Sequence, residues 1–127
     1  MPPGRRSLLI FLLLGWMGLS PVLPALAQAT TAPNVQPQIL ELARKFCPIC
    51  KASDAVILAA QARYPGRFAV RKLYIDEEES LFRRYKVAIV PTQVFLDAAG
   101  REVGRHEGVF KQEALMQKLR SLKFISD

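Results

Sequence analysis

Two cysteines, separated by two residues, are the residues of this sequence best suited to chemistry. Cys47 and Cys50 are its only cysteines, and they stand in the run FCPICK at residues 46–51. Two thiols at this spacing can close a small disulfide ring and reopen it. The spacing has three common uses, which are a dithiol redox centre, half of a tetrahedral metal site, or a structural disulfide.

The metal and structural uses fit the rest of the sequence poorly. A structural zinc site needs four ligands, and the Cys pair supplies two. The single histidine, His106, stands between Arg105 and Glu107 in a polar segment that is typical of a surface. A ring this small also constrains few residues of the unfolded chain, so it would add little stability. We therefore favour redox exchange and expect neither a metal nor a cofactor.

The segment after the first cysteine is predicted to be a helix. Residues 48–63 contain five alanines, the best helix former, and no glycine. Pro48 is acceptable in the first helical turn, where its missing N–H costs nothing. Cys47 would then lie at the helix N-terminus, where unpaired N–H groups and partial positive charge favour a thiolate. Cys50, one turn further, would resolve the mixed disulfide.

A carboxyl group precedes the cysteines in an otherwise apolar run. Glu41 interrupts residues 39–43, which suit a buried strand. Burial would raise its pKa and let it accept or return a proton. Lys72, on the next predicted strand (68–75), is a candidate partner for Glu41. An exposed edge carboxylate and an ordinary surface lysine remain the alternatives.

The remaining pattern predicts the elements that position these residues. A short helix is expected to begin at Glu77, followed by a strand at 93–96, a turn at 97–100, a polar strand at 101–107 and a helix at 111–122. The long crossover helix favours a parallel pair for the first two strands, and the hairpin adds an antiparallel pair. We therefore predict an α/β domain with a mixed sheet and helices on both faces.

The N-terminal residues have the pattern of an export signal. Arg5 and Arg6 precede an apolar run at residues 7–19, and Ala25-Leu26-Ala27 resembles a small-x-small cleavage site. The run is shorter than the roughly 20 residues that span a bilayer. We expect a signal peptide at 1–27, cleaved after Ala27 or Ala29, a flexible lead at 28–38 and a domain at 39–127. An uncleaved membrane anchor is the alternative.

Charge and export together restrict the protein's surroundings. The formal net charge is +7, and it falls to +5 without Arg5 and Arg6. The cations are spread along the chain, which argues against nucleic-acid binding and for a solvated basic surface. An exported protein works where disulfides form and persist, so the bacterial periplasm is the expected location.

With these features together, residues 39–122 resemble the thioredoxin superfamily, in particular its small exported members. The run at 46–51 is similar to the family's aromatic-Cys-x-x-Cys-Lys site, and Val90-Pro91-Thr92 to its Ile/Val-Pro-Thr loop. Asp76, Gly100 and Gly108 also fall at the family's spacing. The resemblance implies a near-minimal thioredoxin fold with a mixed four-stranded sheet, and it leaves open a short fifth strand.

The resemblance also implies roles for individual residues. Pro91 would have a cis peptide bond and face the Cys pair, and the Val90 backbone would pair with a substrate strand. Glu41 would be the family's buried acid and Lys72 its lysine partner. The remaining predicted substrate contacts are Phe46, Pro48, Ile49 and Thr92.

Two departures from thioredoxin itself bear on the site. Pro48 comes first between the cysteines, where thioredoxin has Gly-Pro, and the intervening pair is a main control on redox potential. Ala43 stands where thioredoxin has a tryptophan, so one wall of the site is thinner.

The predicted function is that of an exported thiol-disulfide oxidoreductase. The redox-active disulfide is Cys47–Cys50, and the reductive direction is favoured. The partners would be protein disulfide substrates and a membrane thiol-transfer protein that supplies electrons to a monomeric enzyme. A disulfide oxidase or isomerase is one alternative. A thioredoxin-like module that holds Cu(I) on its thiolates is another, although no Met or His stands near Cys47.

Overall fold

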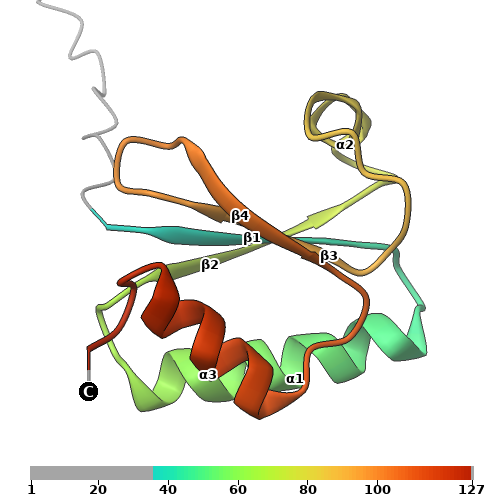
Figure 1. Ribbon diagram of the computed structural model, residues 1–127. Coiled ribbons are helices and arrows are strands. Elements are labelled where there is room, and N and C mark those ends of the chain that lie inside the picture. The colour runs from blue at the N-terminus through green and yellow to red at the C-terminus, as the bar shows by residue number, and fades with distance from the viewer. Residues whose placement is uncertain (1–35, 127) are drawn as a thin grey trace, which may run out of the picture.

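The computed structural model describes residues 36–126 of the chain, so the predicted signal and most of the predicted lead lie outside the described residues. Seven elements follow one another in the predicted order (Figure 1). They are β1 (Gln38–Ala43), α1 (Pro48–Arg63), β2 (Ala69–Tyr74), α2 (Glu79–Arg84), β3 (Thr92–Leu96), β4 (Glu102–Glu107) and α3 (Gln112–Ser121).

The four strands form one mixed sheet in the order β2-β1-β3-β4. β1 pairs with β2 in parallel, as the crossover through α1 requires, and with β3 in antiparallel orientation. β3 and β4 form the predicted antiparallel hairpin. β1 is therefore a central strand, and its C-terminal end leads directly to the cysteines.

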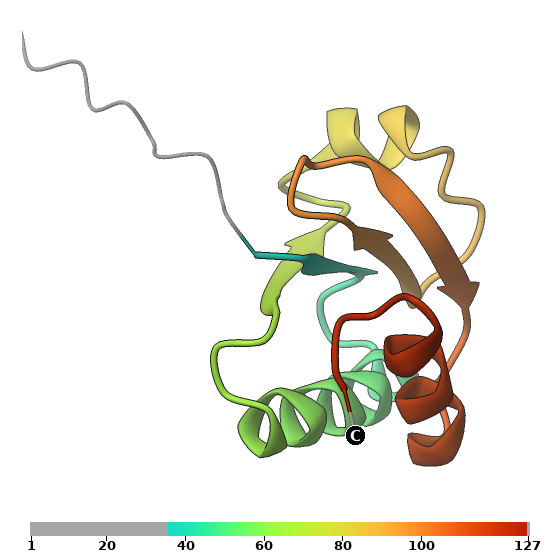
Figure 2. The same ribbon diagram turned by 60° about the vertical axis from the view of Figure 1, so that its left-hand side comes forward.

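Helices cover both faces of the sheet. α1 and α3 lie together on one face, and α2 lies on the other (Figures 1 and 2). Because side chains alternate along a strand, β1 serves both layers. Ile39 packs in the core under α1 and α3, whereas Leu40 and Leu42 pack with Phe82 of α2. Phe95 of β3 anchors the larger core and meets Phe110 and Phe124 edge to face.

Local hydrogen bonds explain where two elements depart from their predicted bounds. The strand predicted to reach residue 75 ends at Tyr74, whose carbonyl accepts the N–H groups of Glu77 and Glu78 at 3.0 and 2.8 Å. This turn delays α2, so the helix begins at Glu79 and not at Glu77 as predicted. β1 begins one residue earlier than predicted, at Gln38.

The architecture confirms the predicted thioredoxin-like fold with its mixed four-stranded sheet. The short fifth strand left open by the sequence is not found among residues 36–126. Within the same residues, no helix has the length and apolar character needed to cross a membrane.

Candidate active site

Cys47 and Cys50 form a disulfide at the N-terminus of α1, with their Cα atoms 5.2 Å apart. Cys47 is the N-cap residue, and its Sγ accepts the backbone N–H of Cys50 at 3.3 Å. Cys47 is half-buried, whereas Cys50 is only 4% exposed. The geometry therefore makes Cys47 the sulfur that an incoming disulfide can reach, and it places Cys50 behind it.

Exposed apolar side chains stand beside the cysteines in the sequence and in the loop that precedes β3. Phe46 is 95% exposed and adopts a left-handed backbone conformation with φ +58°, which an aromatic residue rarely takes. Ile49, between the cysteines, is 55% exposed, and Ile89 is 50% exposed. Exposed apolar residues gathered beside a reactive group are typical of a binding surface. We call Phe46, Ile49 and Ile89 the apolar rim.

Hydrogen bonds of Pro91 and Thr92 hold the loop before β3 in place. The Val90–Pro91 peptide bond is cis, as the resemblance implies, and the Pro91 carbonyl accepts the N–H of Gly108 at 2.7 Å. Thr92 donates its hydroxyl to the Ile89 carbonyl at 2.7 Å. Thr92 also stands opposite Leu42 in the sheet register. Pro91 therefore lies at the same end of the sheet as the C-terminal end of β1, from which the chain continues to the cysteines.

Glu41 is buried as predicted, with none of its surface exposed. Neither carboxylate oxygen has a hydrogen-bond partner among the described residues. Burial, and then the nearby Asp54 carboxyl, raise the pKa of Glu41 to about 7. The Ser53 hydroxyl and the positive charge of Lys72 act in the opposite direction and lower this pKa. A carboxyl group with this pKa can both give and take protons near neutral pH.

Lys72 occupies the strand position opposite Glu41, but its ammonium forms an ion pair with Asp54 of α1. The direct ion pair of Lys72 is therefore with Asp54 and not with Glu41, although the Lys72 charge still acts on Glu41 and lowers the pKa of that carboxyl group. Sequence reasoning missed Asp54 altogether. A signal was present, since Asp54 is the only acid in residues 48–63 and follows Cys50 by one helical turn.

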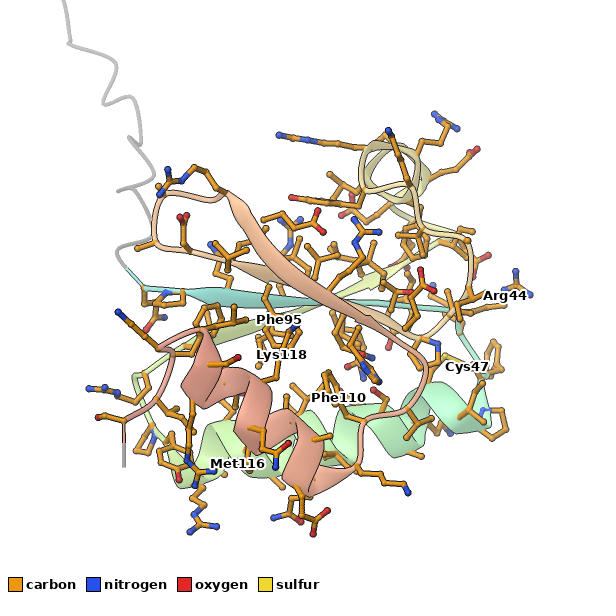
Figure 3. All side chains as sticks on the ribbon, viewed as in Figure 1. Arg44, Cys47, Phe95, Phe110, Met116 and Lys118 are labelled. Atoms are coloured by element: carbon orange, nitrogen blue, oxygen red, sulfur yellow. A yellow bond between two sulfur atoms is a disulfide. The ribbon has the colours of Figure 1, made fainter. Side chains whose placement is uncertain are left out.

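A pocket of about 230 Å³ opens beside the disulfide. Ala43 forms part of the pocket wall. The sequence predicted a thinner wall at this position, because thioredoxin has a tryptophan there. The pocket is lined by four cationic side chains and by no carboxylate. Figure 3 shows Arg44 and Cys47 at this end of the molecule. The lining residues are Ala43, Arg44, Lys45, Phe46, Cys47, Cys50, Lys51, Lys72 and Tyr74.

His106 is half-buried, so the surface position that its polar neighbours predicted holds for only part of its side chain. Its ring stacks on Phe110 with centroids 3.6 Å apart, and its Nε2 is buried without a hydrogen-bond partner among residues 36–126. The same residues contain no group of three or more His, Cys, Asp and Glu side chains placed to hold a metal ion.

Comparison with known proteins agrees with this geometry. Residues 25–121 match the thioredoxin family. The chain belongs to the thioredoxin family. It is 33% identical over 58 residues to Thioredoxin-1 of Drosophila melanogaster and to that of Drosophila yakuba, which covers 46% of this chain. The aligned part spans about half the length of these curated relatives, 54% of each.

Solved thioredoxin structures share the fold. The germline-specific thioredoxin Deadhead of Drosophila melanogaster superposes with a TM-score of 0.65 at 26% identity, over 72% of this chain and 86% of that one. A malaria-parasite thioredoxin-2, described as a component of the parasite's protein secretion machinery, gives a TM-score of 0.63 at 22% identity, over 68% and 82%. Family and Cys pair together are consistent with a thiol-disulfide oxidoreductase.

Proposed function

We propose that the protein is an exported thiol-disulfide oxidoreductase that reduces disulfides in other proteins. The observation that carries this proposal is the arrangement of three groups. A half-buried Cys47 caps α1 and a buried Cys50 lies one turn behind it, while Glu41, on the strand that leads to the cysteines, is buried against Ser53 and Asp54 of the same helix with a pKa of about 7. These groups supply the attacking sulfur, the resolving sulfur and the proton exchanger that disulfide exchange needs.

The reaction has two steps. The Cys47 thiolate attacks one sulfur of the substrate disulfide and forms a mixed disulfide with it. The substrate S–S bond breaks, and its other sulfur leaves as a thiolate that takes a proton from solvent. Cys50 then loses its proton to the Glu41 carboxylate and attacks the Cys47 sulfur. The Cys47–Cys50 disulfide forms, and the second substrate thiolate is released. Two electrons have passed to the substrate, so a dithiol donor must reduce the disulfide again.

The surface around Cys47 suits an extended polypeptide as substrate. The apolar rim offers contact area beside the sulfur, together with the exposed Pro48. The Val90 backbone is positioned by the anchored Pro91 and Thr92, and by resemblance it would pair with the substrate strand. Substrate binding is therefore assigned to Phe46, Pro48, Ile49, Val90, Pro91 and Thr92.

The location and donor are part of the same proposal. The pattern of residues 1–27 supports export to the periplasm, with an uncleaved anchor as the alternative. A reductant outside the cytoplasm must draw its electrons across the membrane, so a membrane thiol-transfer protein is the proposed donor to the monomer. Fractionation of cells that express the full chain, followed by N-terminal sequencing, should find a soluble exported protein that begins at residue 28 or 30. A cytoplasmic protein with an intact N-terminus would contradict export.

Insulin reduction in the presence of dithiothreitol tests the activity. The purified protein should accelerate precipitation of the insulin chains, and Cys47→Ser should abolish the acceleration. Cys50→Ser should accumulate a mixed disulfide with the substrate, detectable by mass spectrometry, because Cys47 can still attack. A wild-type protein that gives no acceleration but binds Cu(I) tightly would overturn the proposal in favour of a copper-binding module.

The oxidising direction is the second candidate, and the protonation of Glu41 favours it. A carboxyl group with a pKa of about 7 can also donate a proton to Cys50 when the disulfide opens. Equilibration of the Cys47–Cys50 pair with glutathione buffers decides between the directions. A reduction potential near that of thioredoxin, about −270 mV, supports a reductant, and one near −120 mV supports an oxidant.

A further inference from the structure

Asp54 contributes a second carboxyl group beneath the sheet, beside Glu41. Three charged or titratable side chains meet there from three elements, Glu41 from β1, Lys72 from β2 and Asp54 from α1. The other polar groups that face Glu41 are neutral. The Ser53 hydroxyl and the Gln93 amide are both buried and lie 2.9 Å apart in a hydrogen bond with each other. The cluster therefore holds two carboxyl groups and one cation.

One cation can neutralise only one of the two carboxyl groups. The ammonium of Lys72 is in contact with Asp54, and Glu41 makes no hydrogen bond or ion pair among the described residues. An isolated buried carboxylate is unfavourable, and a like charge nearby makes it more so. Of the two carboxyl groups, Glu41 is consequently the one that keeps its proton.

The ion pair is the part of this three-residue cluster that reaches the solvent. The side chains of Asp54 and Lys72 are 21% and 28% exposed, and Lys72 lines the pocket beside the disulfide. Glu41 itself has no exposed surface. A proton that leaves or reaches Glu41 therefore has a polar route past this pair.

We propose that Asp54 is a positioning residue for proton transfer, because by holding Lys72 it keeps Glu41 protonated in the oxidised protein. This inference rests on the proposed function. When a donor thiolate attacks Cys47, the Cys47–Cys50 bond breaks and its electron pair stays on the Cys50 sulfur. The Glu41 proton then moves to that sulfur. The Glu41 carboxylate that remains is the form that accepts the Cys50 proton when the next substrate disulfide is reduced, and exchange of this proton with solvent would pass the Asp54–Lys72 pair.

Carbon-13 NMR of the oxidised protein, labelled at the glutamate carboxyl carbons, tests the electrostatic part without any turnover. Loss of one signal in Glu41→Gln identifies Glu41. Asp54→Asn removes the like charge and frees Lys72 for Glu41, so the titration midpoint should fall by about one pH unit. Lys72→Gln removes the cation and should move the midpoint upward. Glu113→Gln, an exposed acid of α3, is the matched control and should leave it unchanged.

The Glu41 midpoint should fall in Asp54→Asn and rise in Lys72→Gln. General damage to the site would not shift the midpoint in opposite directions in the two variants. A midpoint unmoved in both variants, or moved in the same direction, would overturn the proposal. Circular dichroism checks folding, and Lys72→Gln alone still decides the sign if Asp54→Asn does not fold.

Reduction of the Cys47–Cys50 disulfide by dithiothreitol, followed against pH, supplies the kinetic readout. In Asp54→Asn the pH profile should shift to lower pH by the same amount as the NMR midpoint, and in Glu41→Gln that part of the profile should disappear. If the wild-type protein reduces insulin but Asp54→Asn keeps the wild-type profile, the role of Asp54 is refuted and the oxidoreductase function stands.

Discussion

Lys72 and Glu41 stand opposite each other on neighbouring parallel strands, yet the Lys72 ammonium is paired with Asp54 of α1. Glu41 is left fully buried and without a hydrogen-bond partner among residues 36–126. The buried acid therefore exchanges protons near neutral pH, and its ionisation is coupled to the stability of the fold.

Replacement of Glu41 by Leu should change how stability depends on pH. The pKa of Glu41 is about 7 in the folded protein, against 4.5 for an unperturbed glutamate. Between these values the unfolded chain releases a proton that the folded protein retains. The free energy of unfolding therefore falls as pH rises from about 4.5 to about 7, by about 3 kcal/mol in total. Below this window both states are protonated, and above it both are ionised.

Glu41→Leu removes this loss, so its free energy of unfolding relative to wild type should rise by about 3 kcal/mol between pH 4 and pH 8. Urea unfolding of the oxidised proteins at both pH values measures the difference. Glu113→Gln provides the control for a change at an exposed acid. A Glu41→Leu protein with the pH dependence of wild type would show that Glu41 ionises normally.

Much of the site could be predicted from sequence because its signals are local. The Cys spacing, the alanine-rich helix after it and the single acid in an apolar strand each lie within a few residues. The burial of Glu41 followed from that strand pattern. The pattern of apolar and turn residues also predicted the order of elements and the parallel pair around α1.

The partner of Lys72 could not be predicted in the same way. Glu41, Asp54 and Lys72 are at least 13 positions apart and lie on three different elements. The two carboxyl groups compete for one ammonium group, and which of them pairs with it depends on how α1 is rotated against the sheet. His106 shows the same difficulty. Its sequence neighbours are charged, but the glycine turn at Gly108 brings Phe110 back onto its ring.

Polar substitution in the apolar rim should weaken substrate binding without loss of stability. Ile49 and Ile89 are each at least half exposed, so they add little to the core. If a substrate covers them, Ile89→Ser should raise KM for a protein disulfide by about fivefold, which corresponds to about 1 kcal/mol of apolar burial. Steady-state insulin reduction measures KM. Val103→Ser, a similarly exposed residue of β4, is the control, and an equal effect there would contradict the assignment.

The backbone conformation of Phe46, beside Cys47, should lower the free energy of unfolding. Its φ of +58° is disfavoured for an aromatic residue, and its 95% exposed ring gains no packing in return. Asn tolerates the left-handed region, so Phe46→Asn should stabilise the fold by about 1 kcal/mol. The same change should reduce kcat/KM, because it removes an apolar contact. Thermal unfolding and insulin reduction provide the two readouts, and a destabilised Phe46→Asn would show that the ring is packed.

The cationic pocket predicts a preference for acidic segments beside the target disulfide. Four cations line it, but Lys45 and Lys72 are already paired with Glu77 and Asp54. Arg44 and Lys51 have no ion-pair partner among the described residues, so an acidic substrate side chain can pair with them. Each exposed pair is worth about 0.5–1 kcal/mol, or about a two- to fivefold gain in rate at low salt.

Matched disulfide peptides with glutamate or lysine flanks measure this preference. The glutamate peptide should be reduced faster, and the difference should shrink as ionic strength rises, because salt screens exposed charges. Arg44→Gln should lower the rate for the glutamate peptide while leaving an uncharged peptide unaffected. Lys111→Gln, which removes one exposed cation at the start of α3, controls for net charge. Equal losses in Arg44→Gln and Lys111→Gln would assign the preference to the basic surface as a whole, and not to the pocket.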